Sequence, residues 1–245
     1  MTINEPENTK GLNTAQRRTA AEPTSGMIAK KTGTSETLHR EGMSDRVCES
    51  ATAYSAVRKD ERHTIEDYYQ LPDDQRVELI DGVFYDMGAP AVIHQMILLQ
   101  LHLLFEECIR QHGGRCEVFI SPCDVHLDKD NYTMLQPDLF VLCREFDIHA
   151  IRIEGAPDLA LEILSPSTRS RDMILKLYKY QRAGVREYWI VDPKYRTVTV
   201  HDFEAEDYRP QTYDFNEVIP IAISGGQCKI DFSRVMKKIA RYYEE

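Results

Sequence analysis

The sequence predicts an α/β fold with a central mixed β-sheet that is flanked by helices on both sides. Residues 138–143 and 158–164 are nearly continuous apolar runs of strand length, which is the pattern of central strands covered on both faces. Residues 158–192 read as strand, helix and strand, a βαβ-like unit. The other predicted elements are mostly short strands, accompanied by one long, heavily apolar helix at residues 91–112.

Local signals place the elements in order along the chain. Thr64 can cap a short helix, and Pro72 stops it. The Asp81-Gly82 pair predicts the turn of a β-hairpin, and the glycines at 113–114 and 184 end two longer helices. The predicted helices are residues 64–69, 91–112, 169–183 and 232–243, and the predicted strands are residues 76–81, 83–87, 117–120, 124–127, 138–143, 158–164, 186–192 and 197–201.

Two segments of different composition predict the domain organisation. Residues 1–62 are polar, have almost no aromatic side chains and show no apolar period, so we expect a disordered tail. Residues 63–245 are expected to form one domain. Polar side chains interrupt the longest apolar stretch, residues 91–108, and the N-terminus lacks the pattern of a signal peptide. We therefore expect a cytoplasmic protein with no membrane partner.

Charge and cysteine content narrow the classes of function. The net charge of −10 argues against a protein that holds nucleic acid by broad phosphate neutralisation. It does not exclude a nuclease, because a metal site needs clustered carboxylates. The six cysteines include no C-x-x-C pair and are expected to be reduced thiols. A zinc site can be drawn from Cys116, Cys123 and His126, but the spacing fits no common zinc site.

Geometry selects the acidic residues of a candidate site. Asp158 and Glu162 lie on one predicted strand, about 13 Å apart at the usual rise, which is too far for both to bind one small cation. If the strand after Asp138 pairs with the Glu162 strand, the separation falls to roughly 4.8 Å. We therefore favour Asp138 with Glu162 as metal ligands and interpret Asp158 as a strand-start residue.

Glu162 and Lys176 each allow two interpretations. A carboxylate inside an apolar strand is costly to bury, so Glu162 is either a metal or catalytic group or the partner of a buried base. Lys176 shares one face of the following helix with Asp172 and Tyr180, which fits an ordinary surface ion pair. Alternatively, the lysine reaches back to the end of the Glu162 strand.

Several motifs in their order resemble the Uma-type family of restriction endonucleases, in the PD-(D/E)XK nuclease superfamily. The resemblance covers about residues 63–203. It rests on ELIDG at 78–82, PDL at 137–139, EILSPST at 162–168, Asp172 with Lys176 and Tyr180, and AGVREYWIVDP at 183–193. It implies a restriction-endonuclease-like fold, a Mg²⁺-type ion and a nuclease site.

The resemblance also implies roles for individual residues. Asp138, Glu162 and the backbone carbonyl of Ile163 would hold Mg²⁺ or Mn²⁺. The superfamily's lysine should stand two residues after Glu162, where this chain has Leu164, so its role would pass to Lys176. Glu78 resembles an additional upstream acid, which either completes the metal site or pairs with a lysine or arginine.

Three functions remain as hypotheses from the sequence. The first is a metal-dependent endonuclease that hydrolyses phosphodiester bonds of DNA, for which a homodimer would suit the cutting of both strands. The second is a catalytically inactive nuclease-fold module that binds nucleic acid or protein, which Leu164 and the net charge favour. The third is a phosphohydrolase acting on another phosphate ester, since fold alone does not decide function. The recognition sequence, and the choice between DNA and RNA, are not determined.

Overall fold

A six-stranded mixed sheet forms the centre of the computed structural model, which describes residues 62–72 and 74–243. The strands run in the order β10-β9-β8-β7-β5-β3, with β7 and β8 parallel and every other pair antiparallel. Their bounds are β3 (Glu117–Ile120), β5 (Leu139–Leu142), β7 (Leu159–Ile163), β8 (Glu187–Asp192), β9 (Thr197–Asp202) and β10 (Gln211–Asp214). The predicted mixed sheet is confirmed. The predicted tail lies outside the described residues apart from Arg62, so the domain boundary stays a prediction.

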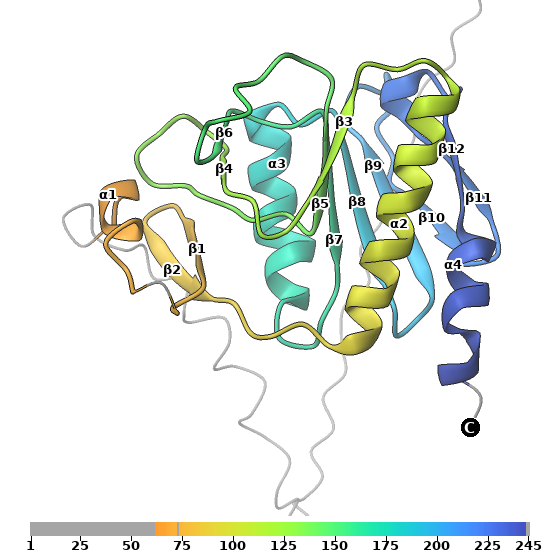
Figure 1. Cartoon of the computed structure of the whole chain (residues 1–245), viewed down its shortest axis with the longest axis horizontal. Helices are drawn as coiled ribbons and strands as arrows, with labels where there is room; N and C mark the ends of the chain where they lie inside the picture. The colour runs from red at the N-terminus through yellow and green to blue at the C-terminus, as the bar shows by residue number, and fades with distance from the viewer. Residues whose placement is uncertain (1–61, 73, 244–245) are drawn as a thin grey trace, which may run out of the picture. The chain divides into compact units, whose positions relative to one another are not determined.

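Helices cover both faces of this sheet. The helices α2 (Val92–Gln111) and α4 (Phe232–Ile239) pack on one face, and α3 (Leu177–Ala183) packs on the other (Figure 1). Successive side chains of a strand point to opposite faces. Leu161 of β7 therefore belongs to the core beneath α2, while Ala160 belongs to the core beneath α3.

The sequence analysis expected polar side chains to keep the long apolar helix below the hydropathy of a membrane-spanning segment, but helix α2 reaches that hydropathy. It is the one helix of the described residues whose length and composition would suffice to cross a membrane. Its inner face packs against the sheet and α4, with seven buried residues: His94, Ile97, Leu98, Leu101, Leu104, Phe105 and Cys108. Leu99 and Leu103 remain more than half exposed on its outer face.

The connection between β7 and β8 confirms the predicted βαβ unit but differs in its first turns. Residues Arg171–Lys176 (η2) are π-helical, and the α-helix proper begins only at Leu177. Gly184 ends α3 with a positive φ of 90°, as a C-terminal glycine was expected to do. Short π-helical segments are rare overall, and those that occur are often found at functional sites.

The N-terminal elements follow their local signals. Thr64 and Asp67 form a reciprocal capping box on α1 (Ile65–Tyr68). The strands β1 (Val77–Ile80) and β2 (Val83–Asp86) form the predicted hairpin. The predicted strand at 124–127 is reduced to β4 (Val125–His126), which pairs in parallel with β6 (Ile153–Glu154), a strand that the sequence analysis did not predict.

The C-terminal region contains elements that the sequence analysis missed. Besides β10 they are β11 (Val218–Pro220), a 3₁₀ turn at Ala222–Ser224 and β12 (Lys229–Asp231). These strands are too short for a clear alternation of apolar and polar residues, and β11 and β12 pair only with each other. The predicted last helix changes to 3₁₀ geometry at Ala240–Tyr242.

The expectation of reduced thiols is wrong for four cysteines. Cys108 is bonded to Cys228 and Cys116 to Cys143, with Cα–Cα distances of 5.7 Å and 4.0 Å. Folding brings each pair together across 120 and 27 residues of sequence, a proximity that spacing alone does not reveal. Cys123 is free, but within the described residues Cys116, Cys123 and His126 do not bring their ligand atoms within 4.8 Å of one another, so they form no zinc site.

Candidate active site

Strand pairing brings Asp138 to the end of the Glu162 strand. Leu139 pairs with Leu161 in the antiparallel β5–β7 ladder, so the preceding residue, Asp138, stands beside Glu162. The backbone N–H of Ile163 donates to Asp138 Oδ2 at 2.8 Å. The predicted neighbouring strands are thus present, and both carboxylates line one pocket.

Lys176 lies among three carboxylates. Its Nζ is 2.8 Å from Glu162 Oε1, 2.8 Å from Glu78 Oε1 and 3.6 Å from Asp172 Oδ1. The lysine and all three acids are buried. Burial alone would lower the pKa of Lys176, but the three carboxylates raise this pKa well above its usual value. Lys176 therefore remains a buried cation, not the surface partner of Asp172.

Glu162 is held by two donors through one oxygen. Lys176 and the Tyr180 hydroxyl both donate to Oε1, at 2.8 and 2.7 Å. Burial raises the pKa of Glu162 well above its usual range, and Lys176 opposes that rise. Its Oε2, like Oδ1 of Asp138, accepts no hydrogen bond from the described residues. Each of the two carboxylates thus keeps one oxygen free for a ligand.

Glu78, on β1, forms ion pairs inside the pocket. Besides Lys176, it approaches Arg171, whose Nη1 lies 3.5 Å from Glu78 Oε2. The backbone N–H of Gln136 donates to Glu78 Oε1 at 3.1 Å. The sequence left two roles open for Glu78, metal ligand or ion-pair partner. Its contacts in the structure are those of an ion-pair partner, and the metal role stays a prediction.

His94 belongs to the same pocket, which the sequence analysis did not predict. Its Nε2 lies 3.1 Å from Asp138 Oδ2, so this nitrogen carries the proton that the carboxylate accepts. Its Nδ1 is buried without a hydrogen-bond partner. The position in the first turn of α2 was visible in the sequence, but nothing local indicated that this turn faces the end of β5.

Asp158 lies outside the pocket, in agreement with its interpretation as a strand-start residue. Its carboxylate accepts the backbone N–H of Cys143 at 2.7 Å and pairs with Arg186 at 3.1 Å. The choice of Asp138 over Asp158 therefore agrees with the geometry of the pocket.

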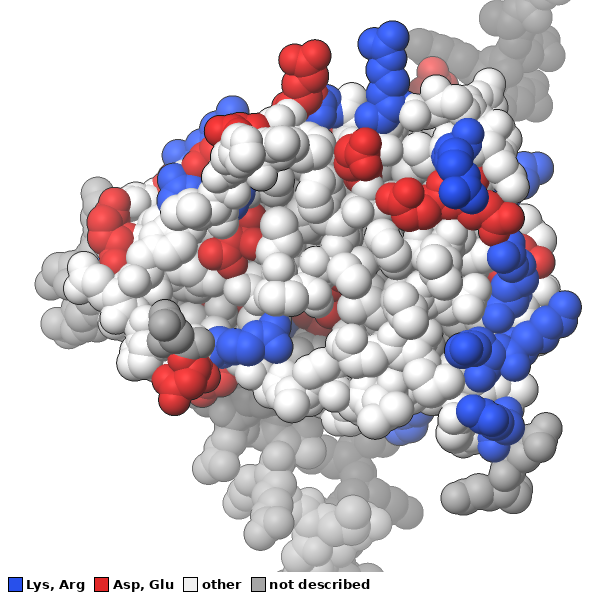
Figure 2. Space-filling view, in the orientation of Figure 1, with Lys and Arg blue, Asp and Glu red and all other residues white. Residues whose placement is uncertain are grey.

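The pocket fits a hard divalent cation by charge and by ligand type. Its volume is about 380 Å³, and acidic side chains are recessed in a hollow near the middle of the face shown in Figure 2. Four acids line the pocket, Glu78, Asp138, Glu162 and Asp172, together with three basic side chains, Arg76, Arg171 and Lys176. Burial raises the pKa of Asp172, and its Oδ1 accepts no hydrogen bond. The excess of carboxylate oxygens is what Mg²⁺ or Mn²⁺ prefers.

Another acidic group lies outside this pocket. Within the described part of the chain, the three carboxylates whose oxygens lie within 4.8 Å of one another are Asp81, Asp128 and Asp130. Lys179 forms ion pairs with Asp81, at 2.9 Å, and with Asp128, which offsets much of their charge. In the candidate site, Lys176 Nζ is instead shared by Glu78, Glu162 and Asp172.

The fold and the acidic pocket at the ends of adjacent strands define a protein of the nuclease-fold class. The chain belongs to the Uma2 family, described as "Putative restriction endonuclease", whose sequence model matches residues 65–230. The family therefore supports a nuclease-like hydrolase that acts on nucleic acid, in agreement with the resemblance found in the sequence.

One protein sequence and one solved structure illustrate what the chain is similar to. An uncharacterized protein of Synechocystis sp. is 36% identical over 110 residues, which are 44% of this chain and 56% of that protein, so the match spans about half of the relative's length. A crystal structure described as "a putative nuclease belonging to DUF820" from Anabaena variabilis superposes with a TM-score of 0.60. That structure is 17% identical, with 72% of this chain and 98% of the other covered, and it supports the fold alone.

Proposed function

We propose that this protein is a metal-dependent endonuclease that hydrolyses phosphodiester bonds of DNA. One observation carries the proposal: Asp138 and Glu162 stand at adjacent strand ends, each with one free oxygen, beside the buried cation Lys176. Membership of the family supports the reaction class. The metal, the DNA substrate and a homodimer that would bring two sites to the two strands are parts of the proposal.

Asp138, Glu162 and the backbone carbonyl of Ile163 would hold Mg²⁺ or Mn²⁺. When bound, such an ion lowers the pKa of a water ligand and polarises a phosphoryl oxygen. The chain orients the two acids in advance. The Ile163 N–H and His94 fix Asp138 through Oδ2, while Tyr180 and Lys176 fix Glu162 through Oε1.

Lys176 supplies a fixed positive charge beside these carboxylates. Its raised pKa keeps it protonated at neutral pH, so it acts as a hydrogen-bond donor and not as a general base. In this role it orients the attacking water or balances the charge that develops on the phosphoryl group.

A second candidate function is a nuclease-fold module that binds nucleic acid or protein without catalysis. The observation that favours it is that Lys176 already has three carboxylate partners and is buried, as in a purely structural ion-pair cluster. Leu164 in place of the superfamily's lysine favours it as well.

A plasmid-nicking assay with Mg²⁺, with Mn²⁺ and with EDTA tests the proposal. We expect nicking that depends on the metal and that falls by about 100-fold or more in Asp138→Asn or Glu162→Gln, because metal binding contributes several kcal/mol to the transition state. Binding of Mn²⁺, followed by its paramagnetic effect on water relaxation, should weaken in the same variants.

Matched controls come from the same sheet. Asp158→Asn changes the other Pro-Asp pair, and Glu187→Gln changes a buried strand glutamate outside the pocket. Both should cleave as the parent does. Metal binding without cleavage of DNA, but with hydrolysis of a small phosphodiester, would point to a phosphohydrolase. If the protein neither binds the metal nor cleaves DNA, the non-catalytic module is the remaining candidate.

A further inference from the structure

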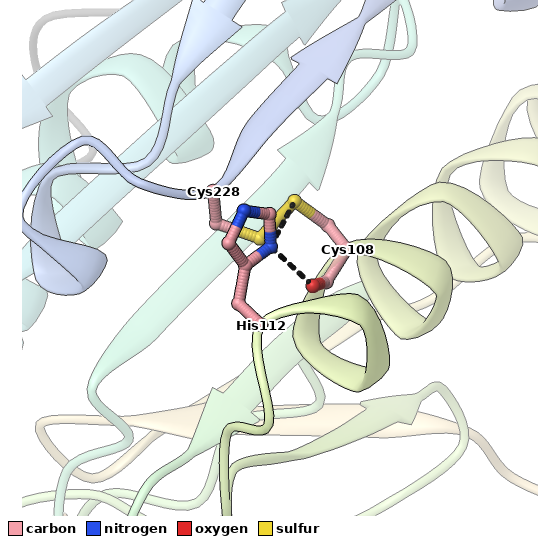
Figure 3. Close-up of side chains that lie close together, drawn as sticks. All are labelled: Cys108, His112 and Cys228. Carbon is pink, nitrogen blue, oxygen red and sulfur yellow. Dashed lines mark hydrogen bonds between the residues drawn. A yellow bond between two sulfur atoms is a disulfide. The ribbon is translucent and has the colours of Figure 1, made fainter.

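A cluster of two cysteines and one histidine lies at the C-terminal end of α2. Cys108 and His112 are four residues apart on this end of the helix, and Cys228 directly precedes β12 (Figure 3). Cys108 stands 14 residues beyond His94 on the same helix. At the helical rise this places the cluster about 21 Å from the pocket residue His94.

We propose that Cys108, Cys228 and His112 form a binding site for a zinc-type divalent cation when the disulfide between the cysteines is reduced. One atom from each of the three, the two sulfurs and a ring nitrogen, lie within 4.8 Å of one another. Cys108 Sγ is 3.9 Å from His112 Nδ1. Tetrahedral zinc, with Zn–S of about 2.3 Å and Zn–N of about 2.0 Å, holds its ligand atoms roughly 3.5–3.8 Å apart.

Backbone groups lie beside the proposed ligands. The backbone N–H of Lys229 donates to Cys108 Sγ at 3.2 Å, and hydrogen bonds of this kind help to orient metal ligands. His112 Nδ1 lies 2.8 Å from the carbonyl oxygen of Cys108. Nδ1 is also the ring nitrogen near Cys108 Sγ, so in the metal-bound state it would exchange the carbonyl contact for the metal, with the ring proton on Nε2.

The metal and the disulfide are alternative states of the same two sulfurs. Both sulfurs belong to buried residues, whereas His112 is exposed, so a fourth coordination position is open to water. A reducing environment would supply the thiol form. Either state links α2 to β12, which pack against each other.

Zinc titration of the full chain before and after reduction tests the proposal. A phosphine reductant supplies two electrons, the sulfurs take up two protons, and water provides the oxygen of the phosphine oxide. We expect one Zn²⁺ to bind per reduced chain, in competition with a chromogenic chelator, and none to bind to the oxidised chain. Co²⁺ in place of Zn²⁺ should give sulfur-to-metal charge-transfer absorption in the near ultraviolet.

His112→Gln is the informative variant because it leaves both thiols and the disulfide in place. It should weaken Zn²⁺ binding by at least about tenfold, since even an outer partner of a metal ligand contributes that much. Cys116→Ser and Cys123→Ser, which change thiols outside the cluster, should bind as the parent does. The titrations are made with excess Mg²⁺ and in the Asp138→Asn variant, so that Zn²⁺ bound at the acidic pocket does not add to the measured stoichiometry.

Three results would each overturn the proposal. They are a reduced chain without stoichiometric Zn²⁺, His112→Gln with parental affinity, and cobalt absorption that is lost in Cys116→Ser. None of them depends on nuclease activity, so failure here leaves the proposed endonuclease untouched.

Discussion

Lys176 holds the acids of the candidate site together at the scale of single residues. It is paired with Glu162, Glu78 and Asp172, and none of these four side chains has access to much solvent. A buried charge that loses its partner is strongly destabilising, because the remaining charges are neither hydrated nor paired. The ion pairs of this cluster therefore contribute to stability whether or not the site is catalytic.

Lys176→Met should lower the free energy of unfolding at neutral pH by about 3–5 kcal/mol, since it leaves buried carboxylates unpaired. Urea unfolding followed by circular dichroism measures the change. Lys179→Met is the control on the same helix. The Lys179 side chain is itself 7% exposed, but its partners Asp81 and Asp128 are 52% and 19% exposed and can be hydrated in the variant, so a smaller loss of about 1–2 kcal/mol is expected. Equal losses of stability in the two variants would contradict the claim that Lys176 stabilises the fold more than Lys179 does.

Glu187 is a buried acid on β8 outside the pocket. It accepts hydrogen bonds from Trp189 Nε1 and from the backbone N–H of Ile223, at 2.7 and 3.0 Å. Burial raises the pKa of Glu187, and these donors only partly oppose the rise. The folded chain therefore binds this proton more tightly than the unfolded chain does.

The sign of the pH effect follows from that raised pKa. The contribution of Glu187 to stability is fully present below the pKa of an unfolded glutamate, about 4.3, and is lost as the pH rises through the folded pKa. The stability of Glu187→Gln relative to the parent should therefore increase from pH 4 to pH 8 in urea unfolding. Glu117→Gln, an exposed glutamate on β3, should show no such trend. A constant difference for Glu187→Gln would contradict the raised pKa.

At the scale of elements, helix α2 has one packed face and one exposed face. Its inner face is packed against the sheet and α4, while Leu99 and Leu103 are 56% and 53% exposed. An apolar helix of this length is expected both in a buried core and in a membrane, so length and composition alone do not distinguish the two.

Leu101→Ala should lower the free energy of unfolding by about 2–5 kcal/mol, because Leu101 is fully buried and its truncation leaves a cavity. Leu99→Ala on the outer face is the matched control and should cost well under about 1 kcal/mol. Thermal unfolding of the two variants beside the parent measures the difference. A larger loss in Leu99→Ala would show that the outer face is covered in solution.

The connection from β7 to β8 was predicted in type but not in detail. Strand, helix and strand were visible because each has its own period and because Gly184 marks the helix end. The π-helical turn at Arg171–Lys176 was not visible, since backbone geometry of this kind depends on what the turn packs against. This turn carries both Asp172 and Lys176 to the buried site.

The site was predictable in part at the scale of the whole molecule. Asp138 and Glu162 could be paired from two apolar runs and the known spacing of strands. Lys176 required the family resemblance, because its spacing fits a surface ion pair equally well. His94 was missed, and the cysteine pairs were interpreted wrongly, because these contacts join segments far apart in the chain.

The amino-acid sequence by itself determined the mixed sheet, the hairpin, the long apolar helix and the pair of strand acids. Each of these depends on the periodicity, end signals or rise of a single segment or of two neighbouring ones. Only the tertiary structure decided that Lys176 is buried among three carboxylates, that His94 contacts Asp138 and that Cys108 lies beside Cys228. These features depend on long-range packing, whose outcome is set by the whole chain and has no local signal.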